Sequence, residues 1–373
     1  MKTYLVTGST GAIGACLVPM LLADEDTQVR LLIRARDQQH LAERVQELLS
    51  FWGYSPENPV VKRIAAYRSD VTLPLFGLDR QEYEALAGEC SHIIHSAGNV
   101  RMNLSLEEAR KSSVDSTSNI TAFAWRCREN GILQKVEFVS TVGVGGRLGG
   151  IVPESWLTQQ RSFHNTYEEA KAEAEEMIRS EIEAGLPVTV HRPSMVVGRS
   201  DSGEIIHFQV FYHICKFLSG RRTFGFVPAL ENAFLDIIPV DYVAKVIRWS
   251  SERQETVGKV LHLCSGPEHA IPIEQLKSTI RSIFRASGTK LPHSFTIPLP
   301  FFKSGLPLIG LFLLAPAKRA IKALPFLFDY LEEVQKFANE ETRKMHEQDG
   351  IEFPLVGDYL KTVVEYYLQK MKR

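Results

Sequence analysis

A glycine-rich turn close to the start of the chain constrains the fold more than any other segment. The run Leu5-Val-Thr-Gly8-Ser-Thr-Gly11-Ala-Ile-Gly14 follows a strand-like run and precedes a helical pattern. In strand–turn–helix units that bind dinucleotides, the first glycine permits the sharp turn, the second lets the backbone approach a pyrophosphate, and the third lets the helix pack closely. The helix N-terminus then offers unpaired amides to the phosphates. The pattern predicts a dinucleotide site formed by Thr7, Gly8, Thr10, Gly11, Ala12, Ile13 and Gly14.

The first half of the chain alternates short β-branched runs with longer amphipathic runs, which is typical of βαβ units on a parallel sheet. We therefore predict an α/β fold with a Rossmann-type, doubly wound parallel sheet and a smaller, mostly helical C-terminal lobe. The predicted strands are 4–7, 29–33, 63–67, 92–95, 136–140 and 188–191, and the predicted helices are 13–23, 38–50, 80–88, 105–130 and 165–184. Runs at 235–244 and 260–264 are expected to return to the sheet, with a helix at 240–250. The predicted dinucleotide-binding domain is 1–198 plus about 235–266, and the substrate lobe is about 199–234 plus 267–373.

Composition excludes several classes of protein. The 373 residues carry 43 Lys and Arg against 44 Asp and Glu, so the net charge of −1 offers no general attraction for nucleic acid. The five cysteines are scattered without a Cys-x-x-Cys pair, which disfavours zinc ribbons and a disulfide framework and indicates a reducing compartment. We assign no metal, because His92 and His95 would face opposite sides of a strand.

The N-terminus enters a strand pattern at once, so secretion is not expected. We expect a cytoplasmic location instead. The most apolar stretch, Phe295 to Ala317, is interrupted by four prolines and falls short of the roughly 20 residues that a membrane-spanning helix needs. It is expected to be a buried or lid segment, with peripheral membrane contact or a wall of a substrate tunnel left open as alternatives.

The residues after the second predicted strand favour NADP over NAD. An enzyme that prefers NAD usually carries a carboxylate there, which binds the ribose 2′-hydroxyl. Here no carboxylate ends the strand, and Arg34 and Arg36 offer guanidinium groups that suit a 2′-phosphate. Further cofactor contacts are expected from residues that end the third and fourth strands, namely Asp70, Val71, Ser96, Ala97 and Gly98.

A tyrosine and a lysine four residues apart, Tyr167 and Lys171, would share one helix face. A nearby ammonium is expected to lower the pKa of the phenol and make it a general acid or base. The same spacing recurs at Tyr212/Lys216 and Tyr366/Lys370, where packing is the expected role. Only the first pair follows a strand that ends in hydroxyl residues, Ser140-Thr141, within the βαβ half.

Together, these motifs resemble the extended short-chain dehydrogenase/reductase superfamily over roughly residues 1–265. The segments around Leu32-Ile-Arg-Ala35, His191 to Gly203 and Asp236 to Val243 resemble one branch, the thioester reductases and fatty acyl-CoA reductases. The resemblance implies a catalytic triad of Thr141, Tyr167 and Lys171, with Ser140 as the alternative hydroxyl, and cofactor contacts from Pro193, Ser194 and Val196. One departure is Ser113, which stands where the superfamily often has an Asn that supports the lysine through water.

The function that follows is NADPH-dependent reduction of an acyl thioester, bound to CoA or to an acyl-carrier protein, to an aldehyde, with further reduction to the alcohol left open. The alternative is an NADP-dependent oxidoreductase of ketones or secondary alcohols, or an epimerase, of the same superfamily. A non-catalytic scaffold is disfavoured, because Tyr167 and Lys171 are both present. Aromatic residues of the second lobe, Phe208, Phe211, Phe217, Phe224, Phe226, Phe295, Phe301, Phe302, Phe312, Phe326 and Phe328, either line an acyl site or pack the lobe.

Overall fold

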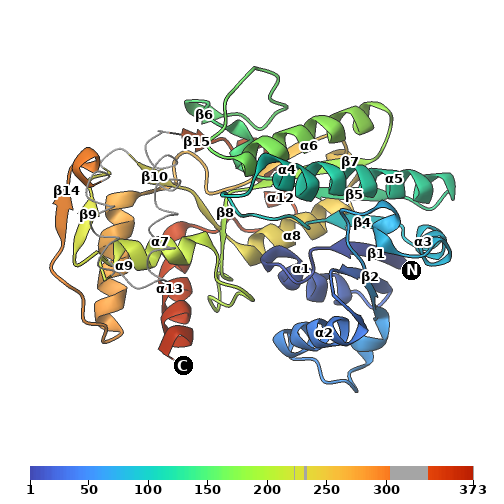
Figure 1. Cartoon of the computed structure of the whole chain (residues 1–373), viewed down its shortest axis with the longest axis horizontal. Helices are drawn as coiled ribbons and strands as arrows, with labels where there is room; N and C mark the ends of the chain where they lie inside the picture. The colour runs from blue at the N-terminus through green and yellow to red at the C-terminus, as the bar shows by residue number, and fades with distance from the viewer. Residues whose placement is uncertain (222, 231–232, 303–334, 373) are drawn as a thin grey trace.

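A parallel β-sheet of seven strands forms the centre of the molecule (Figure 1). The structure is a computed structural model that describes residues 1–221, 223–230, 233–302 and 335–372. The sheet order is β12-β7-β5-β4-β1-β2-β3. These strands are β1 (Lys2–Thr7), β2 (Thr27–Ile33), β3 (Ile64–Arg68), β4 (His92–His95), β5 (Lys135–Val139), β7 (Val188–Pro193) and β12 (Val260–Leu263). The order reverses between β1 and β4, where doubly wound sheets bind ligands at the carboxyl ends of their strands. The predicted fold class is confirmed.

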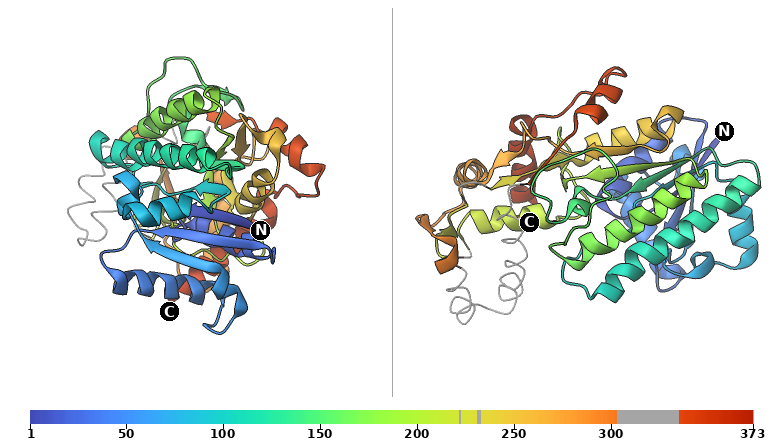
Figure 2. Two further views of the ribbon diagram at one scale, coloured as in Figure 1. Left: turned by 90° about the vertical axis from the view of Figure 1, so that its right-hand side faces the viewer. Right: turned by 90° about the horizontal axis from the view of Figure 1, so that it is seen from above.

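Helices cover both faces of the sheet (Figure 2). Helices α1 (Ala12–Leu22), α2 (Gln38–Trp52) and α8 (Val240–Ser251) pack on one face, and α3 (Arg80–Ala87), α5 (Ser116–Glu129) and α6 (Thr166–Glu183) pack on the other. Successive side chains of a strand point to opposite faces, so Leu5 and Val6 of β1 belong to different cores. This two-sided burial explains why many positions of the central strands are apolar. The buried polar residues among them have partners: in β5, Lys135 donates to the Arg253 carbonyl and Glu137 bonds His191.

The helix predicted over 105–130 is interrupted. Helix α4 (Leu106–Arg110) ends in a π-helical turn at Lys111–Asp115, and α5 begins only after it. The hydroxyls of Ser116 and Thr117 donate to the carbonyl oxygen of Ser113 at 3.1 and 2.6 Å. Apolar periodicity cannot reveal this turn, because its apolar neighbours keep nearly the spacing of a regular helix.

Helices α7 (Val210–Leu218), α9 (Ile273–Ala286) and α13 (Val356–Lys372) form the region beyond the carboxyl ends of the strands, at the left of Figure 1. Their apolar faces join the core beneath α1 and α8, through Phe211, Ile280 and Val363 among others. The remaining elements are α12 (Glu340–Glu347) and short 3-10 turns at Pro59–Arg63, Pro74–Gly77, Val142–Gly145 and Gln254–Thr256. The division of the chain into two domains stays a prediction.

One of the late runs joins the main sheet and the other does not. Strand β12 returns to the main sheet as predicted, and it pairs there with β7. The run at 235–244 is different: β10 (Phe234–Leu235) pairs with β13 (Ile271–Pro272), and β11 (Ile237–Pro239) pairs with β8 (Met195–Val197). Two further small pairs are β9 (Phe226–Pro228) with β14 (Phe295–Ile297), and β6 (Gly150–Val152) with β15 (Gln335–Phe337). The sequence pattern shows that these runs are extended, but it does not show which strand each one pairs with.

Most of the apolar stretch after Phe302, with Phe312, Phe326 and Phe328, lies outside the described residues. Within the part of the chain that is described, no helix combines the length and apolar character that crossing a membrane requires. Phe211 and Phe217 are buried in the core, so for these two rings the packing role is the one observed.

Candidate active site

The glycine-rich turn adopts a conformation that larger residues could not share. Gly8 has a φ of +73°, and a Cβ there would stand 2.6 Å from the carbonyl carbon of Ser96 at the end of β4. A Cβ on Gly14 would stand 2.4 Å from the carbonyl oxygen of Gly8. Gly14 thus lets α1 pack closely against the turn that follows β1. The turn therefore presents backbone without side chains at the amino-terminal end of α1, which suits the binding of a dinucleotide phosphate.

A cavity of about 330 Å³ lies between this turn and the amino-terminal end of α6. It brings together all three residues predicted for catalysis, the alternative Ser140, and several residues predicted for the cofactor. Predicted residues that line it are Gly8, Gly11, Ala12, Ile13, Ser96, Gly98, Ser140, Thr141, Tyr167, Lys171, Pro193, Ser194 and Val196. Segments distant in sequence meet here because the carboxyl ends of parallel strands share one edge of the sheet.

The other predicted cofactor residues, Thr7, Thr10, Gly14, Arg34, Arg36, Asp70, Val71 and Ala97, stand outside this lining. Thr7 is fully buried, and its hydroxyl bonds His95 Nδ1 at 2.9 Å and accepts from the Ala97 amide at 3.1 Å. It therefore ties the ends of β1 and β4 together. Asp70 accepts from the amide and hydroxyl of Thr72, so its carboxylate caps a local turn.

Two arginines meet beside the glycine-rich turn. The Arg44 guanidinium, on α2, donates to the Arg34 carbonyl oxygen at 2.5 Å and to the Thr10 hydroxyl at 2.7 Å. Burial, and then the charge of Arg34, lower the pKa of Arg44. Arg36 is turned toward His40 Nδ1, to which its amide and Nε donate. Two like charges held together beside the turn form a site suited to a phosphate.

The residues of the predicted triad converge at the amino-terminal end of α6. Asn165 caps this helix by accepting from the Glu168 amide at 3.0 Å. Tyr167 lies in the first turn and Lys171 one turn later, buried, with Nζ donating to the Val139 carbonyl at 3.0 Å. Thr141 begins the 3-10 turn after β5 and accepts from the Gly143 amide at 3.1 Å.

The two candidate hydroxyls differ in their surroundings. The Thr141 hydroxyl lies close enough to the Tyr167 phenol to act on its pKa in the lowering direction. The Ser140 hydroxyl is buried and has no hydrogen-bond partner among the described residues. Both residues line the cavity, and the choice of Thr141 as the reacting hydroxyl stays a prediction.

The protonation states differ from the sequence prediction. Burial raises the pKa of Tyr167 to about 12, and the hydrogen bond with Thr141 only partly opposes this. Burial also lowers the pKa of Lys171 to about 8, while the Glu175 carboxylate acts in the opposite direction. The expected lowering of the phenol pKa by the lysine is not found, because desolvation dominates. The phenol is thus protonated at neutral pH, as a proton donor must be.

We expect the rate of carbonyl reduction to fall as the pH rises through about 8, because Lys171 then loses the charge that supports an oxyanion. Tyr167, with a pKa near 12, stays protonated over this range. A profile of kcat/KM between about pH 6 and pH 10 tests this. Lys171→Arg, which keeps its charge throughout, should flatten the alkaline limb if it retains activity. A wild-type rate that is constant to pH 10 would contradict the assignment.

The position of the missing Asn is occupied by Ser113 in the π-helical turn. Ser113 is buried, and its carbonyl oxygen already accepts from the Ser116 and Thr117 hydroxyls. The neighbouring His95 is buried too, and desolvation and the Lys171 charge lower its pKa to about 3. The hydroxyls of Thr7 and Ser116 flank this neutral imidazole at 2.9 and 3.5 Å.

A buried ion pair fixes the catalytic helix to the sheet. Arg192 of β7 donates to Glu175 of α6 through Nε at 3.0 Å and Nη2 at 2.6 Å. Both side chains are almost completely buried. Glu175 lies one turn after Lys171, and Arg192 directly precedes Pro193 of the cavity lining. The pair therefore joins the two segments that face each other across the site.

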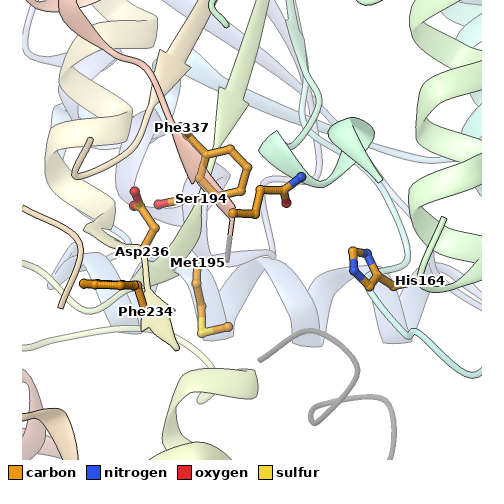
Figure 3. A pocket seen from close by; sticks show the side chains of 7 residues that line it. His164, Ser194, Met195, Phe234, Asp236 and Phe337 are labelled. Carbon is orange, nitrogen blue, oxygen red and sulfur yellow. The ribbon is translucent and has the colours of Figure 1, made fainter. Parts of the chain in front are cut away.

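A second, much smaller cavity of about 20 Å³ adjoins the first, since Ser194 and Met195 line both. Figure 3 shows Asp236 and His164 on opposite sides of it. Asp236 accepts from the amides of Ser265 and Gly266 at 2.7 and 3.2 Å, yet burial raises its pKa to about 6. This space is about the size of one water molecule.

Several residues of the site were not anticipated. Arg44 and Glu168 are helical residues whose orientation no local motif reveals, and Gln209 and Val210 reach the cavity from the start of α7. The sequence feature that could have indicated a cofactor role for Arg44 is its position on the predicted amphipathic helix, ten residues after Arg34.

Comparison with known proteins agrees with this geometry. Residues 6–247 match the model of a family of NAD-binding proteins described as male sterility protein. The chain belongs to this family. The male sterility family lies within the extended short-chain dehydrogenase/reductases, so the predicted superfamily is confirmed, and the chain is an oxidoreductase that uses a nicotinamide cofactor.

Among solved structures, the terminal R domain from the myxalamid PKS-NRPS biosynthetic pathway superposes with a TM-score of 0.81 and 26% identity, covering 100% of this chain and 90% of that one. The isonitrile lipopeptide synthase of Streptomyces coeruleorubidus is 29% identical over 65% of this chain and 16% of its own length. The L-2-aminoadipate reductase of Schizosaccharomyces pombe is 25% identical over 71% of this chain and 19% of its own. This male sterility family member thus spans less than a fifth of either curated relative.

Proposed function

We propose that the protein reduces an acyl thioester to an aldehyde with NADPH. The observation that carries the proposal is the single cavity in which Thr141, Tyr167 and Lys171 face the glycine-rich turn. Likeness to the myxalamid R domain over the whole chain supports the same reaction class. A second hydride transfer to the aldehyde would give the alcohol.

The chain's own residues would act on the substrate carbonyl. Thr141 and Tyr167 bind the carbonyl oxygen and stabilise the charge that develops on it. A bound nicotinamide supplies the hydride for the carbonyl carbon. Tyr167 gives its proton to that oxygen, while the buried Lys171 ammonium stabilises the phenolate that is left. Collapse of the resulting hemithioacetal breaks the carbon–sulfur bond and releases a thiol and an aldehyde.

NADPH, rather than NADH, is proposed because Arg34 and Arg44 concentrate positive charge beside Thr10. Of the predicted pair, Arg34 is kept in the proposal because its charge acts on Arg44, whereas Arg36 donates to His40 and would have to turn. Asp70, Val71 and Ala97 are proposed to lie along the adenosine half of the cofactor, where they follow β3 and β4.

Replacing Arg34 and Arg44 together by alanine is expected to lower kcat/KM for NADPH by roughly 10- to 100-fold, because charge-assisted contacts with the 2′-phosphate are lost. The value for NADH should change little. Initial rates with each cofactor at a fixed thioester concentration measure the two effects. Arg80→Ala, an exposed arginine at the start of α3, serves as the matched control. Equal losses with both cofactors would contradict the phosphate assignment.

The thioester donor is proposed to be an acyl-carrier protein, with acyl-CoA as the second candidate. The structures that superpose include a thiolation-reductase di-domain from an archaeal non-ribosomal peptide synthetase, with a TM-score of 0.76 at 19% identity. That identity supports the fold, and the carrier assignment to this chain is our proposal. A cytoplasmic location is proposed because all five cysteines are free and buried.

Peripheral membrane contact is also a proposal, and it rests on exposed aromatic rings. The rings of Phe226 of β9 and Phe295 of β14 are tilted against each other with centroids 5.5 Å apart, and both are solvent-exposed. Amphipathic surfaces of this kind can lie against a bilayer. Sedimentation with anionic vesicles, compared between the wild type and Phe226→Ser/Phe295→Ser, tests the contact.

The decisive assay incubates the protein with NADPH and an acyl thioester and measures free thiol and aldehyde. Thioester reduction predicts one thiol for each aldehyde formed. A ketone or alcohol oxidoreductase of the same superfamily would oxidise NADPH with a ketone and release no thiol. An absence of thiol release with both CoA and carrier-bound donors would overturn the proposal.

A further inference from the structure

A segment from the far end of the chain contacts the turn that begins at Thr141. The 3-10 turn Val142–Gly145 directly follows Thr141, and the chain then runs on into β6. Strand β15 pairs with β6 in parallel, and the two lie side by side in Figure 1. The pairing therefore brings the C-terminal part of the chain to the edge of the active site.

The Gln335 side chain, at the start of β15, makes two hydrogen bonds to the backbone that follows this turn. Gln335 Nε2 donates to the Gly146 carbonyl oxygen at 3.0 Å and to the Leu148 carbonyl oxygen at 2.7 Å. Both partners are acceptors, so the NH2 group of the amide, with its two N–H donors, is the end that suits them. A Cβ on Gly145 would stand 3.4 Å from Gln335 Nε2, so the amide lies directly against the end of the turn.

Apolar packing joins the same C-terminal segment to the catalytic helix. Phe337 is 4% exposed and belongs to a small core that also contains Val142, Val144 and Ala172. Ala172 directly follows Lys171 on α6. The segment thus shares one core with the turn after Thr141 and with the helix that carries Lys171.

Further hydrogen bonds fix this segment to the main sheet and to the chain beyond β6. Asn339 Nδ2 donates to the carbonyl oxygen of Cys264, the residue after β12, at 2.9 Å. The Glu154 carboxylate accepts from the amides of Glu341 and Thr342 at 2.7 and 3.1 Å. Because the residues after Gln335 are anchored in this way, the Gln335 amide is a fixed support for the turn.

We propose that Gln335 is a positioning residue that acts on the reaction through Thr141. This inference rests on the proposed thioester reduction and on Thr141 as the reacting hydroxyl. The Thr141 carbonyl oxygen accepts from the Val144 amide at 3.3 Å, and its hydroxyl accepts from the Gly143 amide at 3.1 Å. The orientation of Thr141 therefore depends on the turn that Gln335 holds at its far end. Gln335 lines the small cavity, whereas Thr141 lines the larger one with Tyr167.

Replacing Gln335 by glutamate tests the role, because it keeps the shape of the side chain and removes both N–H donors. We expect kcat for an acyl-pantetheine thioester to fall by about 10- to 100-fold, the range that a small misplacement of a reacting group can cost. The affinity for NADPH, measured by fluorescence titration, should change little. Gln335→Met removes the donors without adding a charge and should give the same pattern. Gln348→Glu, at an exposed glutamine after α12, is the matched control.

A double-mutant cycle with Thr141→Ala separates positioning from a general effect on the fold. If Gln335 acts through the Thr141 hydroxyl, Gln335→Glu should change kcat by no more than about two-fold once that hydroxyl is absent. An equal loss in both backgrounds, or a Thr141→Ala variant with the wild-type kcat, would overturn the positioning role. A wild type that turns over no acyl thioester would overturn the proposed function instead.

Discussion

Replacing Tyr167 by phenylalanine is expected to reduce kcat for thioester reduction by roughly 10²- to 10⁴-fold, the range that a positioned general acid contributes. The ring would still fill its place, but the carbonyl oxygen would lose both a hydrogen bond and its proton source. With a pKa near 12, the phenol is protonated at working pH, so its removal takes away the acid form itself. Steady-state rates at saturating substrate and NADPH measure the effect.

Tyr366→Phe provides the control for this result. Tyr366 and Lys370 have the same four-residue spacing, and the Lys370 ammonium lies 5.3 Å from the Tyr366 ring centroid, but neither residue lines the cavity. The affinity for NADPH, measured by fluorescence titration, should be similar in both variants. If Tyr167→Phe turned over within a few-fold of the wild type, Tyr167 would not be the proton donor.

The second large effect concerns stability. Glu175→Ala should lower the free energy of unfolding by about 3–5 kcal/mol, because it leaves the Arg192 guanidinium buried without its counter-charge. The loss should also reduce activity, since the pair joins the helix of Lys171 to the strand that ends at Pro193. Urea unfolding followed by circular dichroism gives the change in free energy.

Two further variants make this result specific. Glu176→Ala removes the neighbouring, exposed carboxylate and should change stability by no more than about 0.5 kcal/mol. The double variant Glu175→Met/Arg192→Met should be less destabilised than either single change, because no buried charge remains. A Glu175→Ala variant as stable as the wild type would mean that the Arg192 charge finds water or another partner.

The strands of the main sheet and the glycine-rich turn could be predicted because their causes are local. The run His92–His95 has matching bounds in the structure, where all four residues are buried and the two central ones are the apolar Ile93 and Ile94. Gly8 adopts the positive φ that its place in the motif requires. The pairing of Tyr167 with Lys171 on one helix face likewise follows from helical geometry alone.

What could not be predicted depends on contacts between distant segments. The π-helical turn at 111–115 leaves the apolar spacing nearly intact. Arg44 meets Thr10 only after α2 packs beside the turn, and Glu168 lines the cavity with His164 beside its carboxylate. The pKa of Tyr167 is raised because burial dominates. The sequence shows the nearby charge of Lys171, but it does not show this burial.

The most direct test of the central claim follows the hydride itself. NADPH carrying deuterium at C4 of the nicotinamide, in the transferred position, is incubated with an acyl thioester, and the aldehyde is analysed by mass spectrometry together with the free thiol. The account predicts one deuterium on the aldehyde carbon for each thiol released. Aldehyde without deuterium, or cofactor oxidation without thiol, would contradict reduction of a thioester in this cavity.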